Sequence, residues 1–87
     1  MTPAFTLSPG VLVQEQDGEA FLLEVASGQY FSLNHTGLLV WRALAEGGDP
    51  EAAVAAQYPD VAAGVRQRDV ARILEDMATA GLVRRGG

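Results

Sequence analysis

"GQYFSLNHTGLLVW", residues 28–41, decides the fold, because its hydrophobic pattern changes in the middle. The first half alternates in the manner of a strand, whereas Leu38 and Trp41 in the second half share the spacing of one helix face. Asn34 lies at the change, and its side chain can accept a hydrogen bond from an unpaired backbone N–H of a first helical turn. We therefore predict a strand before Asn34 and a helix that runs from there to about Glu46.

Two tight turns divide the preceding chain into strands. Asp17–Gly18 is a strong hairpin signal, since Gly tolerates the positive φ that such turns need, and Ser27–Gly28 marks a second turn. The strands predicted around these turns are residues 10–16, 19–26 and 29–33. Because short turns join them in sequence, we predict a three-stranded antiparallel meander.

The predicted meander carries apolar side chains on both faces. If the Ser27–Gly28 loop has two residues, Val25 lies opposite Tyr30 and Leu22 opposite Leu33, and opposed residues share a face. One face then holds Phe21, Leu23, Val25 and Tyr30, and the other holds Leu22, Phe31, Leu33 and Glu24. A sheet that helices cover on one side needs only one apolar face. The second apolar face is therefore a first indication of a binding surface.

The chain beyond the first helix predicts two more helices. Asp49 and Pro50 begin a short helix that Pro59 stops. Asp60 can cap a third helix, which extends to about Ala80. Its apolar residues at helical spacing are Val70, Ile73, Leu74 and Met77. The predicted fold class is α+β, a three-stranded antiparallel meander followed by a three-helix bundle, which is similar to a winged helix-turn-helix.

Length and composition fit one small domain. The chain has 87 residues, of which 48% are hydrophobic, and this is enough for a single core. We assign residues 10–83 to that domain. Residues 1–9, which contain Pro3 and Pro9, are expected to form an extended arm, and residues 84–87 a solvated tail.

Composition also restricts the function. The absence of Cys excludes disulfides, thiolate metal ligands and cysteine nucleophiles. The N-terminal residues lack the pattern of a signal peptide, and no stretch approaches the roughly 18 apolar residues of a membrane span. We therefore expect a cytoplasmic protein without a membrane partner. The net charge of −5 disfavours phosphate backbones and anionic lipid, although the acids can equally serve only to keep a small domain dissolved.

No group of side chains has the composition of a catalytic or metal site. His35 is the single His, and one imidazole without thiols or clustered carboxylates does not make a metal centre. Ser32 is close to it in sequence, but no orienting acid completes a triad. Glu75 and Asp76 are adjacent on the predicted helix and therefore point in different directions. We expect no enzyme and no cofactor.

The winged helix-turn-helix outline raises the alternative of a DNA-binding transcription regulator. In that case the third helix would enter the groove with Arg66, Arg68 and Arg72. The same helix carries three acids, and all of them lie within helical reach of Arg72, namely Asp69, Glu75 and Asp76. Few cations then remain for phosphate contacts, which supply most of the affinity of such domains. We therefore expect no nucleic-acid partner.

The strand over Gln29–Leu33 is expected at the edge of the meander, where unpaired N–H and C=O groups can receive an extended peptide. Ile73 and Met77 of the third helix could floor such a groove. The same pattern fits plain core positions beside an edge that the N-terminal arm covers, and periodicity alone does not separate these interpretations. An open edge strand could also pair with its own copy and give a homodimer.

Two motifs resemble the PqqD-like family, the recognition elements of pathways that modify ribosomally made peptides. "GQYFSLNHTGLLVW" is similar to the family's "G-x-Y-x-x-L-N-x-T-G-x-x-x-W". "RDVARILEDMATAGLV", residues 68–83, resembles the family's "D-V-x-x-x-L-x-x-L-x-x-x-G-L-V". The resemblance implies a non-catalytic protein that binds the N-terminal leader of a precursor peptide as an added strand, antiparallel to the third strand, and delivers it to processing enzymes.

The site that the resemblance implies combines the edge strand with one side of the third helix. Its residues are Gln29, Tyr30, Phe31, Ser32, Leu33, Asp69, Arg72, Ile73, Asp76 and Met77. Asp69 matches the acid of the "D-V" pair. Ile73 and Met77 match apolar positions of the family. Arg72 and Asp76 are inferred from helix geometry alone.

The version "EAFLLEVASGQYFSLN", residues 19–34, is most similar to stand-alone members of lasso-peptide pathways. Glu24 departs from that pattern, because an Asp is common at this position. The partners implied are the precursor leader, a cysteine-protease-like leader peptidase and an ATP-dependent cyclase. Members that serve pyrroloquinoline quinone (PQQ) synthesis or radical-enzyme pathways share the same outline and are the alternative.

Overall fold

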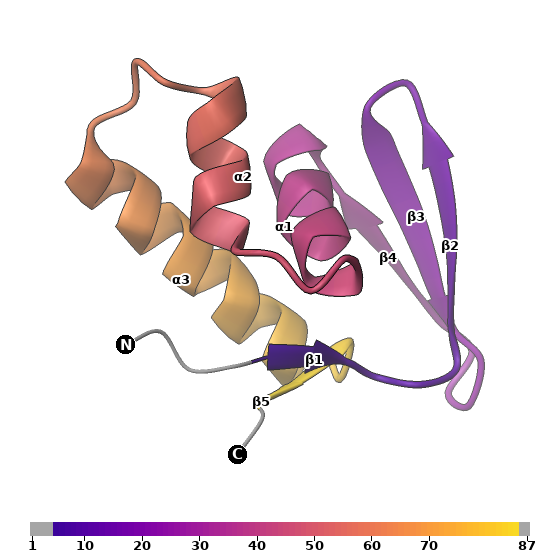
Figure 1. Ribbon diagram of the computed structural model, residues 1–87. Coiled ribbons are helices and arrows are strands. Elements are labelled where there is room, and N and C mark those ends of the chain that lie inside the picture. Colours follow the sequence, from indigo (N-terminus) through magenta and orange to yellow (C-terminus); the bar gives the residue numbers. More distant parts are fainter. Residues whose placement is uncertain (1–4, 86–87) are drawn as a thin grey trace.

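The computed structural model describes residues 5–85, and these form a sheet, a helical bundle and a short ribbon (Figure 1). The elements are β1 (Phe5–Leu7), β2 (Val11–Gln16), β3 (Glu19–Glu24), β4 (Gln29–Leu33), α1 (His35–Ala45), α2 (Pro50–Gln57), α3 (Ala63–Thr79) and β5 (Val83–Arg85). β2, β3 and β4 make one antiparallel sheet in that order, and the three helices follow it. This arrangement confirms the α+β, winged helix-turn-helix-like fold class.

The β3–β4 hairpin corrects the predicted register but keeps the predicted faces. Glu24 pairs with Gln29, so the loop has four residues instead of two, and the Gly28 N–H donates to the Glu24 carbonyl at 2.8 Å. The two-residue loop that predicted Val25 opposite Tyr30 is therefore wrong. The true register differs by two residues, and because side chains alternate with a period of two, each stays on its predicted face. Tyr30 is 77% exposed and Leu22 is fully buried.

The junction between β4 and α1 follows the prediction. Asn34 is the N-cap of α1, and its side-chain oxygen accepts a hydrogen bond from the Gly37 N–H at 2.9 Å. Gly37 lies close to the preceding strand, because an added Cβ there would be 3.3 Å from side-chain atoms of Leu33. The turn therefore brings helix and strand together at this position. α1 then lies between the sheet and α2 (Figure 1), where Leu38 and Trp41 are buried.

A two-stranded ribbon joins the ends of the described chain and was not predicted. β1 pairs antiparallel with β5, with Phe5 opposite Arg85. The expected arm over residues 1–9 thus contains a strand. The tail expected over residues 84–87 begins inside β5, where Arg84 and Arg85 are exposed. Residues 1–4 and 86–87 lie outside the described residues, and the remainder of both expectations falls on them.

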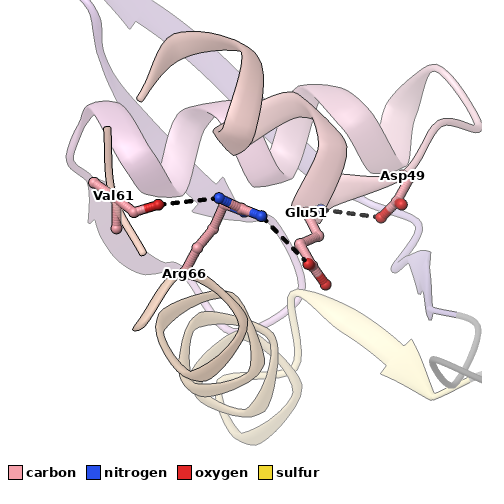
Figure 2. A network of polar contacts seen from close by, with 4 residues as sticks. All are labelled: Asp49, Glu51, Val61 and Arg66. Atoms are coloured by element: carbon pink, nitrogen blue, oxygen red, sulfur yellow. Dashed lines mark hydrogen bonds and ion pairs between the residues drawn. The ribbon is translucent and has the colours of Figure 1, made fainter. Parts of the chain in front are cut away.

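The start of α3 differs from the prediction, and Arg66 contacts the loop before it (Figure 2). The helix begins at Ala63 without a side-chain cap, so the predicted cap at Asp60 is wrong. The Val61 N–H instead donates to the Tyr58 carbonyl at 3.2 Å, and this turn delays the helix. The Arg66 guanidinium donates to the Val61 carbonyl at 3.2 Å and lies 4.0 Å from a carboxylate oxygen of Glu51 in α2. It therefore ties α3 to α2 and to the loop between them.

One hydrophobic core lies between the inner sheet face, the three helices and β5. Its buried members are Ala20, Leu22, Leu38, Leu39, Val40, Trp41, Val54, Val70, Leu74, Met77, Leu82 and Val83. The core holds α3 alongside the sheet, so that one face of α3 is fixed and another is free to line a site.

Candidate functional site

The β4 strand is an open edge of the three-stranded sheet. In the order β2-β3-β4 it is one of the two outer strands, and within the described residues it pairs with β3 alone. Residues 5–7 of the N-terminal segment pair with β5. For residues 5–85, the interpretation in which the arm covers the edge is therefore not supported.

The ladder pattern identifies which backbone groups of β4 are free. The Val25 N–H donates to the Gly10 carbonyl at 3.0 Å, so the backbone of Val25 faces β2. Backbone groups alternate in direction along a strand, and therefore those of Leu22 and Ala20 face β4. Their partners in the register are Phe31 and Leu33. The N–H and C=O groups of Tyr30 and Ser32 consequently point away from the sheet and are available to a further strand.

A cleft of about 570 Å³ separates the end of β4 from α3. Its lining residues are Glu19, Ala20, Phe21, Ser32, Leu33, Asn34, Gly37, Arg72, Ile73, Asp76 and Met77. The cleft thus brings together six of the residues predicted for the site, namely Ser32, Leu33, Arg72, Ile73, Asp76 and Met77. The groove inferred between the edge strand and the third helix is present in the structure.

The other four predicted residues lie outside this lining. Three of them form the first part of β4, before the Ser32–Leu33 end that lines the cleft, namely Gln29, Tyr30 and Phe31. Phe31 packs against the core, whereas the Tyr30 ring is on the outer face of the sheet. Asp69 is exposed on α3, one helical turn before Ile73. Only the backbone of β4 connects the first three to the cleft.

Sequence reasoning missed five lining residues: Glu19, Ala20, Phe21, Asn34 and Gly37. The predicted register placed Leu22 opposite Leu33, whereas Ala20 occupies that position. Ala20 has a small side chain, and Gly37 has none and lies close to Leu33. A correct loop length was the signal that would have identified β3 as part of the wall.

The floor and the rim of the cleft differ in chemistry. Met77 is 3% exposed and Ile73 is half-buried, so both are partly core and partly floor. Arg72 and Asp76 are exposed at the rim. Within residues 5–85 neither has an ion-pair partner. An apolar floor beside free charges suits an extended peptide better than it suits a small metabolite.

The outer sheet face has a second, smaller hollow of about 350 Å³. It is lined by Leu12, Val13, Gln14, Phe21, Leu22, Leu23 and Tyr30. Phe21 lines both hollows and is 52% exposed. The surplus apolar face that the sequence predicted is therefore real, and it adjoins the cleft.

The remaining candidate groups have structural contacts. The His35 Nδ1 lies 2.6 Å from the Tyr58 hydroxyl, so the imidazole links the start of α1 to the end of α2. Arg42 pairs with Glu15, and this hydrogen bond raises the pKa of the Arg42 guanidinium. In the described part of the chain, no group of three or more His, Asp or Glu residues could hold a metal ion. No helix there is both long and apolar enough to cross a membrane.

Two solved structures are similar to this chain over nearly its whole length. One, described as TbiB1 in complex with the TbiA(beta) leader peptide, has 28% sequence identity and a TM-score of 0.85, and the match covers 94% of this chain and 98% of that one. The other, described as lasso peptide synthetase B1 complexed with the leader peptide, has 27% identity and a TM-score of 0.80, with 92% and 96% covered. No curated protein matches the chain.

The family comparison covers the sheet and the bundle together. Residues 19–83 match the family described as coenzyme PQQ synthesis protein D (PqqD), from the start of β3 to β5. The match includes both sequence motifs and all of the cleft lining. PqqD domains are non-catalytic, in agreement with the composition of the chain. The chain belongs to the PqqD family.

Proposed function

We propose that this protein binds the N-terminal leader of a ribosomal precursor peptide as a strand added to β4. The observation that carries the proposal is the open β4 edge beside a cleft whose floor on α3 is apolar. Both similar structures are described as complexes with a leader peptide. Strand addition obtains affinity from main-chain hydrogen bonds and specificity from pockets for alternate side chains.

The backbone of Tyr30 and Ser32 supplies the hydrogen bonds in this proposal. Their free N–H and C=O groups can exchange bonds with a guest strand that runs antiparallel to β4. Guest side chains that point inward then reach Ile73 and Met77. Asp69 would contact a leader that extends beyond the cleft toward the start of α3.

We further propose a lasso-peptide pathway as the setting. One similar structure is described as a lasso peptide synthetase B1, and the stretch over residues 19–34 resembles the stand-alone members of such pathways. The protein would present the bound precursor to a cysteine-protease-like leader peptidase and an ATP-dependent cyclase. This step belongs in the cytoplasm, where a ribosomal precursor is made. The alternative within the family is that the protein acts in a PQQ or radical-enzyme pathway.

The test is a titration followed by fluorescence anisotropy. The probe is a labelled leader peptide from a small open reading frame beside the gene, and the control is a random DNA duplex with the same label. Saturable peptide binding without a DNA response supports the proposal. DNA binding without peptide binding would overturn it in favour of a regulator. That result is not expected, because the Arg66 side chain is only 16% exposed and pairs with Glu51, so this cation is not free to contact phosphate.

The same edge can also pair with a second copy of the chain. In that case the leader and the second copy of the chain compete for the free backbone groups of Tyr30 and Ser32. A homodimer through β4 would then dissociate as leader is added. Sedimentation velocity at increasing protein concentration, with and without the peptide, measures this directly. A dimer that persists at saturating leader would place the dimer contact elsewhere.

A further inference from the structure

The cleft wall on α3 has two parallel rows of side chains. Ile73 and Met77 form the buried row, and Arg72 and Asp76 form the exposed row. Members of each row are four residues apart, which corresponds to about 6 Å along a helix. Alternate residues of a strand are about 6.6–6.8 Å apart. A strand lying along α3 therefore meets each row once every two residues.

The direction of α3 relative to β4 is fixed by the fold. Arg72 and Ile73 line the cleft with Leu33, at the end of β4. The other end of α3 leads to Gly81, where an added Cβ would lie 3.2 Å from the Glu24 carboxylate, beside the start of β4. α3 and β4 therefore run in opposite directions (Figure 1). A guest strand antiparallel to β4 then runs parallel to α3 and passes Arg72 before Asp76.

The exposed row has opposite charges that do not satisfy each other. Arg72 precedes Asp76 by four residues, which is the less favourable order for a helical ion pair. Neither pairs with another residue in the described range. Glu19 also lines the cleft, but β4 lies between it and a guest strand, at two strand spacings or about 10 Å. That distance is about one Debye length, so Glu19 attracts or repels guest charges less strongly than Arg72 and Asp76 do.

We propose that the cleft selects guest strands by charge order, and this inference rests on the proposed function. The guest strand is expected to alternate apolar and charged residues. Its apolar side chains lie opposite Leu33 and Phe31 and contact the buried row. The residues between them face the exposed row. The first of these meets Arg72 and should be acidic, and the second, two residues later, meets Asp76 and should be basic. The preferred guest pattern is apolar, acidic, apolar, basic in the direction of the chain.

Synthetic peptides test the charge order directly. The probes are labelled peptides with identical Ser and Thr flanks around Leu-Glu-Leu-Lys or around Leu-Lys-Leu-Glu, which have the same composition. We expect the first to bind about tenfold more tightly in anisotropy titrations at low salt, since two weak exposed attractions replace two repulsions. The difference should shrink as salt is added.

A charge exchange in the protein gives the decisive comparison. The double variant Arg72→Asp/Asp76→Arg should reverse the preference and bind Leu-Lys-Leu-Glu more tightly. The matched control Asp60→Arg/Arg84→Asp also leaves the net charge unchanged, and both of its residues are exposed and outside the cleft lining. It should keep the original preference, and circular dichroism should show both variants folded.

The outcomes separate this inference from the proposed function. Equal binding of both peptides, or a preference that the Arg72/Asp76 exchange does not reverse, overturns the charge order while leader binding stands. Binding of the natural leader but of neither synthetic peptide overturns it as well. Failure to bind the natural leader and both peptides refutes the proposed function itself.

Discussion

Replacement of Ser32 by Pro should weaken leader binding while it leaves the fold intact. Pro has no N–H, and its fixed φ is compatible with an edge strand whose N–H faces outward. The Ser32 N–H faces the cleft side, because its neighbours Phe31 and Leu33 pair with β3. No hydrogen bond of the β3–β4 ladder is therefore lost. A bound guest strand, by contrast, loses the Ser32 N–H as a hydrogen-bond donor, so one guest carbonyl is left without a partner.

The expected loss follows from the cost of one unmade backbone hydrogen bond. An unsatisfied buried acceptor costs about 1–3 kcal/mol. This corresponds to a Kd for the leader that is about 5- to 150-fold higher. The free energy of unfolding should change by less than about 1 kcal/mol, since the substitution is at an exposed edge position.

Two variants make the measurement specific for the backbone. Ser32→Ala removes the hydroxyl and keeps the N–H, and should bind leader within a factor of two of the unmodified protein. Phe31→Pro removes a ladder hydrogen bond with β3 and a core contact, and should lower the Tm markedly. Leader affinity is measured by anisotropy and stability by urea unfolding. Unchanged affinity in a folded Ser32→Pro variant would refute strand addition at this edge.

Three further substitutions test the core, the junction and the extent of the site. Trp41→Ala should reduce the free energy of unfolding by about 3–5 kcal/mol, because the indole is 5% exposed; an unaltered urea midpoint would remove Trp41 from the core. Gly37→Val should cost about 1–3 kcal/mol by crowding Leu33, and normal stability would mean that the helix shifts to make room. Asp69→Ala should weaken a full-length leader about two- to fivefold but leave a short cleft-sized peptide unaffected. Equal affinities for the full-length leader would exclude Asp69 from the site.

The hairpin illustrates how much of the sheet could be predicted. Asp17–Gly18 was recognised as a turn, and Asp17 has a φ of 54° and Gly18 a φ of 78°, as such turns require. The second hairpin was found but its loop was assigned two residues too short. Loop length depends on a hydrogen bond from Gly28 to Glu24 that no composition signal reports. The predicted faces were still correct because the register error was two residues, which equals the alternation period of side chains along a strand.

Cleft-lining residues that follow from helical periodicity were predicted, and those that follow from strand pairing were missed. Ile73 and Met77 were found because they continue an apolar helical stripe. Ala20 was missed because its contribution depends on lying opposite Leu33. Asp69 was assigned from the family motif, and the structure leaves it outside the cleft lining. Local patterns identify a helix face, but they do not say how far along that face a cleft extends.

The sequence by itself determined the three strands of the meander, the three helices, their order and the junction at Asn34, because these depend on alternation, helical spacing and capping within a few residues. Only the tertiary structure decided that β1 closes onto β5, that α3 begins at Ala63, and that Tyr30 and Ser32 hold the free backbone groups. The physical reason is the range of the interactions. Capping and alternation act between near neighbours, whereas strand pairing and the Arg66 contacts join segments that only folding brings together.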